Sequence, residues 1–353
     1  MTCPAASKAP AIYTRLKAEI TEAGLFEPSP FFYIPLIVLA FSAYLISAWA
    51  IIVWTDYLPL GMACLCFSFS SVQIAGLMHD SGHRAAFKGR RANDLLGYAC
   101  CALIGTVFQS WRLNHNAHHG HPNERGKDPD MEIPFVSTSE ALWERKRGLE
   151  RRLAPWQAYY YYPLGMFVGI TNRLGAVSYF WKRRFRHTTG ALLLYLPAVG
   201  VVFIAPFLLF PVEKAVFVFL LVHLTNGVYL ANCFAPNHKG MYAPSIEERL
   251  SFFEQQTITA RNVKGGWLTD IVLVGLNLQI EHHLFPSCPR NRLRQISPYV
   301  RRACEEARIP YVEMGAIETH KFLWRCLKTV SRGNSQTGVA PVTAYGSTGS
   351  TGK

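Results

Sequence analysis

Residues 58–83 read LPLGMACLCFSFSSVQIAGLMHDSGH, an apolar run that ends directly in two histidines. A helix needs about 20 apolar residues to cross the hydrocarbon core of a bilayer, and Leu58–Met78 has that length. His79 and His83 follow at a spacing of four, which places them on one face of a helix. This stretch therefore predicts a membrane helix that ends in a pair of imidazoles.

The composition of the whole chain suits a membrane protein with a large part in water. The 353 residues are 50% hydrophobic, and their formal net charge is +13. No basic run alternates with stacking aromatic residues, so the charge does not indicate a nucleic-acid partner. An excess of Lys and Arg is typical of the cytoplasmic loops of membrane proteins.

Four segments are long and apolar enough to cross a membrane, and they group into two hairpins. They are Phe31–Trp54, Leu58–Met78, Ala191–Phe210 and Ala215–Ala235. Short turns at 55–57 and 211–214 join the pairs, so the rest of the chain lies on one side of the membrane. That side holds nearly all the Lys and Arg, which marks it as cytoplasmic. We therefore expect an all-α integral membrane protein with four transmembrane helices as two hairpins and a cytoplasmic helical cap.

This interpretation divides the chain into three parts. Residues 1–30 form a cytoplasmic N-terminal segment, which has no short apolar core of the kind found in a signal peptide. Residues 31–330 form one membrane domain. Residues 331–353 form a tail rich in Gly, Ser and Thr, which is expected to be disordered.

Three further stretches have apolar or aromatic character but are not expected to span. Leu95–Trp111 is marginal in length and would, if it crossed, put the first two histidine clusters on opposite faces. It is therefore interpreted as interfacial or re-entrant. Ile271–Ile280 has about half the required length. Trp156–Trp181 is rich in aromatic residues and ends in basic ones, which is typical of a helix in the headgroup layer.

Histidines occur in three clusters, all predicted on the same side of the membrane. The clusters are H-D-S-G-H (His79, His83), H-N-A-H-H (His115, His118, His119) and Q-I-E-H-H (Gln279, His282, His283). Spacings of three and four residues point each cluster at one place. Seven histidines exceed the needs of one tetrahedral zinc ion, whereas two adjacent transition-metal ions would use them all. Imidazole suits several metals, and the membrane setting favours iron.

The remaining histidines are weaker candidates. His187 and His320 are interpreted as packed or surface residues, and His121 falls off the face shared by its neighbours. His223 lies inside the fourth predicted span beside Asn226. It is either functional or part of an interhelical hydrogen bond.

The motifs together resemble the membrane-bound fatty acid desaturase and hydroxylase superfamily over about residues 30–325. The resemblance is carried by H-D-S-G-H, by H-N-A-H-H-G-H-P-N with Gly126–Asp130, by F-A-P-N-H-K-G at Phe234–Gly240, and by G-L-N-L-Q-I-E-H-H-L-F-P at Gly275–Pro286. The last two look most like bacterial acyl desaturases. The resemblance implies a histidine-ligated di-iron centre with O2 as oxidant and two electrons per turnover.

The resemblance also implies further site residues. His238 matches a histidine that completes the metal shell, and Asn237 matches an asparagine that holds a metal-bound water. Gln279 stands where many relatives have a third histidine. This departure is similar to the Q-x-x-H-H branch, whose members often place the new double bond between an existing one and the carboxyl end. The expected ligands are His79, His83, His115, His118, His119, His238, His282 and His283, with Gln279 and Asn237 bound directly or through water.

Carboxylates near the clusters are candidates for orienting the imidazoles. A metal-bound histidine usually has its second ring nitrogen fixed by a hydrogen bond. Asp80, Asp128, Asp130, Asp270 and Glu281 are the candidates, and each has the alternative role of solvated carboxylate or helix cap. Trp111 and Arg112 are candidates for anchoring the carrier end of a substrate, whose acyl chain would need a narrow apolar tunnel.

The function that these expectations favour is O2-dependent desaturation of an acyl chain. Hydroxylation or acetylenic bond formation on a lipid, carotenoid or carrier-bound chain would use the same ligands and stays an alternative. A membrane metal-binding or transport protein is disfavoured, because the histidines are predicted outside the spans. The sequence does not distinguish coenzyme A, a carrier protein or a lipid as the acyl carrier.

Electrons are expected from a separate donor, such as a ferredoxin or cytochrome b5 with its reductase. Some relatives of the Q-x-x-H-H type contain a fused cytochrome b5 domain with an H-P-G-G stretch. The sequence has no such stretch, and its only His-Pro pair is His121-Pro122. A basic cytoplasmic surface would attract an acidic donor.

Overall fold

Four long apolar helices form one end of the elongated molecule. The computed structural model describes residues 8–182 and 189–331. The helices of membrane-spanning length and composition are α2 (Pro30–Val53), α3 (Tyr57–Gly82), the continuous stretch Thr189–Leu209 and α12 (Val212–His238). The third comprises α10 (Thr189–Val199), a π-helical turn at Gly200–Ile204 and α11 (Ala205–Leu209). The predicted all-α membrane fold with four spans is confirmed.

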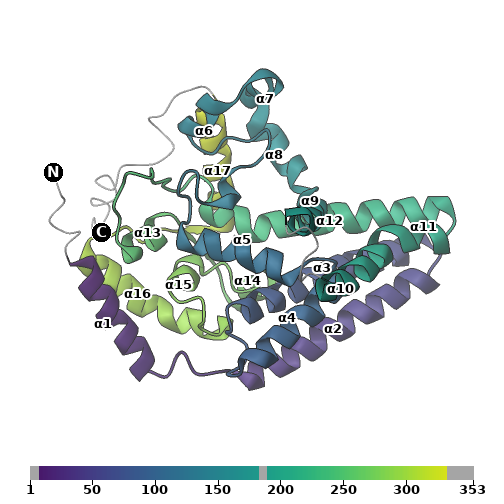
Figure 1. The fold of residues 1–353 in the computed structure, drawn as a ribbon, viewed down its shortest axis with the longest axis horizontal. Coiled ribbons are helices and arrows are strands. Elements are labelled where there is room, and N and C mark those ends of the chain that lie inside the picture. The colour runs from purple at the N-terminus through teal and green to yellow at the C-terminus, as the bar shows by residue number, and fades with distance from the viewer. Residues whose placement is uncertain (1–7, 183–188, 332–353) are drawn as a thin grey trace, which may run out of the picture.

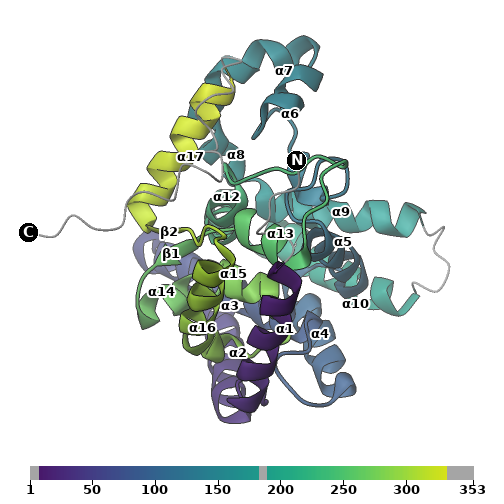
Figure 2. The same ribbon diagram turned by 90° about the vertical axis from the view of Figure 1, so that its left-hand side faces the viewer.

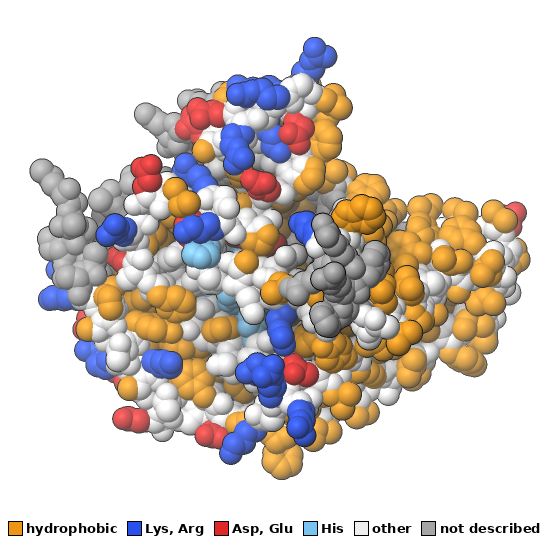
Figure 3. All heavy atoms as spheres, viewed as in Figure 1, with side chains coloured by type: hydrophobic (Ala, Val, Ile, Leu, Met, Phe, Trp, Pro, Cys, Tyr) orange, Lys and Arg blue, Asp and Glu red, His pale blue; other side chains and the backbone are white. Residues whose placement is uncertain are grey.

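The surface of this end is apolar, as contact with lipid requires. Leu39 on α2 and Leu208 on α11 are 68% and 78% exposed. Figure 3 shows apolar side chains over most of this end and the basic side chains gathered at the other. A continuous exposed apolar surface of this size is typical of membrane contact.

Two of the spanning helices continue beyond the apolar segments that the sequence marks. α3 extends to Gly82 and therefore includes His79, and α12 ends at His238. The expected spans Leu58–Met78 and Ala215–Ala235 thus cover only part of each helix, and His79 and His238 lie on the parts beyond them. Hydropathy marks only the lipid-facing part of a helix, whereas backbone hydrogen bonding continues into the cap.

The marginal apolar stretch 95–111 is broken into two helices. α4 (Arg90–Ile104) ends at Gly105, whose φ of +69° suits glycine, and α5 (Phe108–Gly120) follows. α4 packs against α3 and α10. Its 15 residues rise about 22 Å, less than the hydrocarbon core requires. α5 leads back to the cap and carries the second histidine cluster.

Four α-helices follow α5 along the chain. They are α6 (Glu140–Arg145), α7 (Gly148–Leu153), α8 (Gln157–Gly165) and α9 (Val168–Lys182). The predicted headgroup-layer stretch 156–181 thus forms two helices rather than one. α8 and α9 pack against α12, and Gly227 of α12 lies directly against the backbone of Met166.

The cap is built from the two ends of the chain. It contains α1 (Ala9–Glu22), α13 (Phe252–Ile258), α14 (Trp267–Val272), α15 (Gln279–Leu284), α16 (Leu293–Ala307) and α17 (Ala316–Val330). Strands β1 (Asn262–Lys264) and β2 (Glu313–Gly315) pair in parallel, with Asn262 opposite Glu313.

The N-terminal helix is an integral part of this cap. α1 packs on α13 and α16, as Figures 1 and 2 show. Ile12, Leu16 and Ile20 are buried in the same apolar core as Ile296 and Val300 of α16. The predicted disordered tail and His187 lie outside the described residues, apart from Ser331, which follows α17.

Candidate metal centre

Eight histidines converge where the membrane helices meet the cap, and they form two adjoining groups. His79, His83, His115, His119 and His282 make up the first group, and His118, His238 and His283 the second. In each group one nitrogen from every ring lies within 4.8 Å of the others. The rings come from α3 and the residue that follows it, from α5, α12 and α15. The structure thus brings together all eight histidines that were expected as ligands.

The ring nitrogens of the first group face one another. His83 Nε2 and His115 Nε2 are 2.9 Å apart, and His119 Nε2 lies 3.1 Å from His115 Nε2. His282 Nε2 lies 3.1 Å from the same His119 nitrogen. The Nε2 atoms of these four rings therefore face a common small volume.

The sequence clusters do not map one to one onto these groups. His118 and His119 are adjacent on α5 but belong to different groups, and so do His282 and His283 on α15. Successive residues on a helix are separated by about 100°, so neighbours point in different directions. The expectation that each cluster points at one place was therefore too simple. Each of these two helices contributes to both groups.

Burial favours the neutral form of five histidines of the site. The pKa values of His83, His115, His119, His282 and His283 lie well below the usual 6.5, first because the rings are buried and then because they neighbour one another. Neutral imidazole is the form that binds a metal ion.

Hydrogen bonds fix the second nitrogen of several rings. Asp128 accepts from His118 Nδ1 at 3.0 Å, and the carbonyl oxygen of Thr259 lies 3.0 Å from His238 Nδ1. The side-chain oxygen of Gln256 lies 2.8 Å from His283 Nδ1. Such contacts set the tautomer and direct Nε2 into the site.

Asp80 occupies a buried polar network beside the first group. Its Oδ1 lies 3.3 Å from His79 Nδ1. Its Oδ2 accepts from Tyr33 Oη at 2.8 Å and from Arg290 Nε at 2.5 Å. The network ties α2 and the segment before α16 to the end of α3.

Asp128 is held by the backbone of its own loop. It accepts from the N–H of Asn123 at 2.7 Å and of Asp130 at 2.9 Å. Burial raises the pKa of Asp128, but the hydrogen bond from His118 and the nearby charges outweigh this and leave it lowered. Asp130 is more distant, at 3.7 Å from His118 Nδ1, with its side chain mostly exposed.

Two of the predicted orienting carboxylates have other partners. Asp270 pairs with Arg294 and accepts from Asn277, while Glu281 accepts from Asn262 and Tyr311. No hydrogen bond joins either carboxylate to a histidine within residues 8–182 and 189–331. Burial raises the pKa of Glu281.

The histidines rated as weak candidates lie apart from both groups. His121 Nδ1 lies 2.7 Å from Glu124 and His320 Nδ1 lies 3.1 Å from the hydroxyl of Tyr162. His223 is buried within α12 against the rings of Phe203 and Phe219.

Gln279 and Asn237 form a pair next to His238. Asn237 Nδ2 donates to Gln279 Oε1 at 3.1 Å and to the carbonyl oxygen of Leu276 at 2.8 Å. The other end of the Gln279 amide, Nε2, lies 3.0 Å from His238 Nε2. Asn237 thus orients Gln279, and Gln279 presents its amide group to the second histidine group.

A small cavity of about 80 Å³ adjoins the site. His79 and Trp111 line one part of it, and Trp111 also stacks on His115 with ring centroids 4.5 Å apart. The walls combine the polar side chains of Asn172, Arg173 and Asn226 with apolar ones that include Met78 and Phe234, and apolar surface predominates. Arg112 instead pairs with Asp94 at 3.3 Å.

Sequence reasoning missed several residues of the site. Gln256, Thr259 and Arg290 belong to no recognised motif, yet they contact an imidazole or its orienting carboxylate. The sequence offered only an indirect signal for residues 251–261. Ser251 and Glu254 form a capping box that marks the start of a helix, and several polar residues follow it. Most of those polar residues are fully buried in the structure.

The donor atoms fit a bound metal. His79 Nε2 and His283 Nε2 are buried and have no hydrogen-bond partner among the described residues. Buried polar atoms without partners are costly unless a ligand satisfies them. An all-α membrane protein that gathers eight imidazoles in this way has the architecture of an integral-membrane metalloprotein.

Comparisons with known proteins identify the family. Residues 52–315 match the family model described as "Fatty acid desaturase". The chain is 27% identical over 315 residues to a Delta(8)-fatty-acid desaturase of Euglena gracilis, covering 85% of this chain and 74% of that protein. It is 30% identical over 267 residues to an acyl-lipid 8-desaturase of Rebecca salina, covering 72% and 60%.

A third relative is a Delta(5) fatty acid desaturase of Caenorhabditis elegans, 27% identical over 327 residues, with 85% of this chain and 69% of that protein covered. The chain belongs to the fatty acid desaturase family and is an oxidoreductase of the desaturase class.

Proposed function

We propose that this protein uses two iron ions and O2 to introduce a double bond into a fatty acyl chain. The observation that carries the proposal is the pair of adjoining histidine groups, which gather eight imidazoles at the membrane end of the cap. An unactivated methylene C–H bond has no acidity that a side chain can exploit. When bound, the metal ions supply the oxidising chemistry, and the protein supplies ligands, orientation and exclusion of water.

The residues of the chain divide this work. His79, His83, His115, His119 and His282 would hold one ion, and His118, His238 and His283 the other. Asp80, Asp128 and Gln256 would fix ring orientation through the second nitrogen. Gln279 and Asn237 would bind an ion directly or through water. Trp111 would close the site toward the cavity and exclude water.

The substrate is proposed to be a long acyl chain that reaches the site from the membrane. The relatives are named for desaturation at positions 8 and 5, and one is named as acting on acyl lipids. Gln279 gives this chain the Q-x-x-H-H pattern, which favours a new double bond between an existing one and the carboxyl end. The cavity beside His79 supports entry between α3, α9 and α12.

Electrons are proposed to come from a separate donor on the cytoplasmic face. Basic side chains gather at the cap end of the molecule (Figure 3), which supports both the orientation of the cap and attraction of an acidic donor. A ferredoxin, or cytochrome b5 with its reductase, has the required chemistry.

Replacement of His118 tests this proposal. His118→Ala removes a second-group ligand and the partner of Asp128, so bound iron and product formation should both be lost. The matched control is His121→Ala, three residues along and outside both groups, which should keep both. The variants are expressed in cells with a reductase and carrier, and iron content and the fatty acid profile are measured. A fully active His118→Ala protein would overturn the di-iron assignment.

A further inference from the structure

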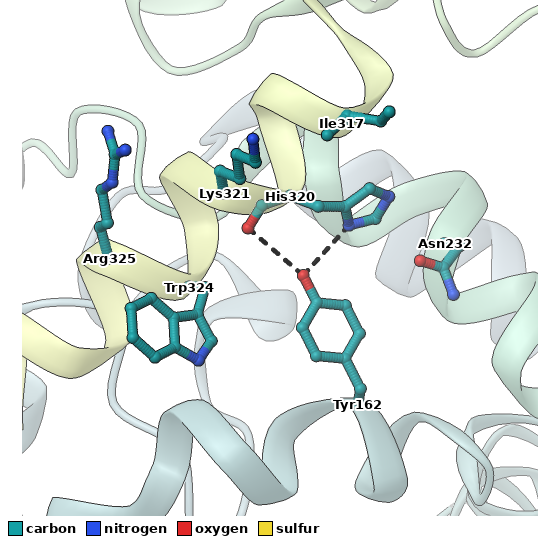
Figure 4. A pocket seen from close by; sticks show the side chains of 7 residues that line it. All are labelled: Tyr162, Asn232, Ile317, His320, Lys321, Trp324 and Arg325. Atoms are coloured by element: carbon teal, nitrogen blue, oxygen red, sulfur yellow. Dashed lines mark hydrogen bonds between the residues drawn. The ribbon is translucent and has the colours of Figure 1, made fainter.

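A separate hollow of about 690 Å³ lies between α8, α12 and α17. Its lining residues are Tyr162, Asn232, Ile317, His320, Lys321, Trp324 and Arg325, and Figure 4 shows them around one open space. The Tyr162 hydroxyl is 3.1 Å from His320 Nδ1. The reaction proposed above uses none of these side chains.

The hollow lies on the opposite side of α12 from the cavity beside the histidines. Asn232 faces the hollow, whereas Leu230 and Phe234 line the cavity. Residues two apart on a helix point about 200° from each other. A ligand of the hollow is therefore distinct from an acyl chain at the metal centre.

The position of Asn232 along α12 places the hollow at the membrane boundary. Asn232 lies 20 residues after Val212, the first residue of α12. At 1.5 Å per residue this is a rise of about 30 Å, the thickness of the hydrocarbon core. The hollow is therefore at headgroup level, on the same side of the membrane as the histidines.

Positive charge at the hollow is not neutralised by the protein. Lys321 and Arg325 are exposed one turn apart on α17, and neither makes an ion pair with a carboxylate in the described part of the chain. The nearest acidic residue on the helix, Glu318, accepts from the N–H of Gly315 instead. A bound anion would neutralise the positive charge of Lys321 and Arg325.

The rim of the hollow is aromatic and apolar. Trp324 lies between Lys321 and Arg325 in sequence, and its ring centroid is 6.1 Å from that of Tyr159. Ile317 is 73% exposed. Tryptophan and tyrosine are enriched where a membrane protein crosses the headgroup layer. Cations beside such an apolar rim fit a molecule with an anionic head and hydrocarbon chains.

We propose that this hollow binds the phosphate headgroup of an anionic glycerophospholipid. Lys321 and Arg325 bind the phosphate, Tyr162 and Asn232 offer hydrogen bonds to the polar part, and Ile317 and Trp324 contact the chains. Basic pockets at the cytoplasmic boundary are known to hold anionic lipid headgroups. The site goes beyond the proposed reaction, because it requires no metal and no turnover.

Native mass spectrometry of the purified full chain tests the proposal, with dioleoyl-phosphatidylglycerol as the probe and dioleoyl-phosphatidylcholine as the neutral comparison. The wild-type chain should retain phosphatidylglycerol preferentially. Lys321→Gln with Arg325→Gln should weaken its binding roughly tenfold, because each cation near anionic lipid contributes substantially. The charge-conserving pair Lys321→Arg with Arg325→Lys should retain binding, which separates lost charge from lost folding.

Arg91→Gln with Arg152→Gln is the matched control, since it removes two exposed charges elsewhere on the chain and should leave binding unchanged. Equal binding of the two lipids, or unchanged binding by the Lys321/Arg325 glutamine variant, would overturn the proposal. Competition by millimolar coenzyme A or inorganic phosphate would show a soluble phosphate ligand instead of a lipid.

Discussion

Asp128 is a buried carboxylate that contacts only one imidazole of the metal centre, which makes its contribution measurable. It accepts from His118 Nδ1 and from two backbone N–H groups. Asp128→Asn keeps the volume but removes the charge that favours this hydrogen bond. Iron affinity should fall by about 10- to 100-fold, the usual effect of losing such a partner. Iron retained after dialysis against a chelator measures this.

The control for this variant is Asp270→Asn, which changes a carboxylate paired with Arg294 outside the site. Iron retention of the control should match that of the wild-type chain. Equal retention by Asp128→Asn would show that the His118 contact does not support metal binding.

The buried neutral histidines make the metal-free protein sensitive to acid. His115 and His282 have pKa values well below 6.5 in the folded state because of burial, so the unfolded chain binds more protons as the pH falls. Their contribution to stability is complete above pH 6.5 and is lost as the pH falls below it. The melting temperature of the metal-free protein in detergent should drop between pH 7.5 and 5.5. A melting temperature that stays constant would contradict neutral burial.

At the residue scale, the sequence identified the histidines and the nearby carboxylates Asp80 and Asp128, but not the partners contributed by other helices. His115 and His119 lie four apart on one helix, so their shared direction is readable from the sequence. His283 meets Gln256, and Asp80 meets Arg290 over 200 residues away in the chain. Those contacts depend on how separate helices pack, which no spacing rule contains.

The contact between α12 and the α8–α9 segment depends on one glycine. A Cβ atom on Gly227 would lie 1.9 Å from the carbonyl oxygen of Met166. Gly227→Ala therefore forces the helices apart, and we expect a loss of about 1–3 kcal/mol, the usual cost of overpacking. The change in melting temperature of the detergent-solubilised protein reports this loss.

Gly175→Ala on α9 is the matched control, because no atom lies within 4 Å of the added Cβ. That variant should be as stable as the wild type or slightly more stable, since alanine favours helix. Equal melting temperatures for Gly227→Ala and Gly175→Ala would show that α12 and Met166 are not packed as closely as the structure indicates.

At the element scale, hydropathy predicted the four spans because lipid contact demands an unbroken apolar surface. It could not give their full extent, since α3 and α12 continue into the cap as polar helices that carry His79 and His238. The marginal length of 95–111 did not show that the stretch breaks into two helices at Gly105. Gly105 ends α4 in the left-handed conformation that glycine commonly adopts after a helix, and the chain then continues into α5.

The topology of the whole molecule follows from its two hairpins. Reporters placed after Asp130 and at the C-terminus should both report the cytoplasm, whereas one at Asp56, in the turn between α2 and α3, should report the outer side. The physical reason is the retention of Lys and Arg on the cytoplasmic side. Protease protection in oriented vesicles gives an independent reading. Opposite locations for the first two reporters would contradict convergence of the histidines.

Both histidine groups depend on α15, the last ligand-bearing helix, and this has a consequence for biosynthesis. His282 belongs to the first group and His283 to the second. A growing chain that has already inserted α2, α3 and α12 therefore still lacks one histidine of each group. Neither group is complete until the ribosome has passed residue 283. Under the proposed di-iron function, iron can bind at a complete group only after α15 has been synthesised, and a chain that terminates before residue 282 lacks a histidine in each group.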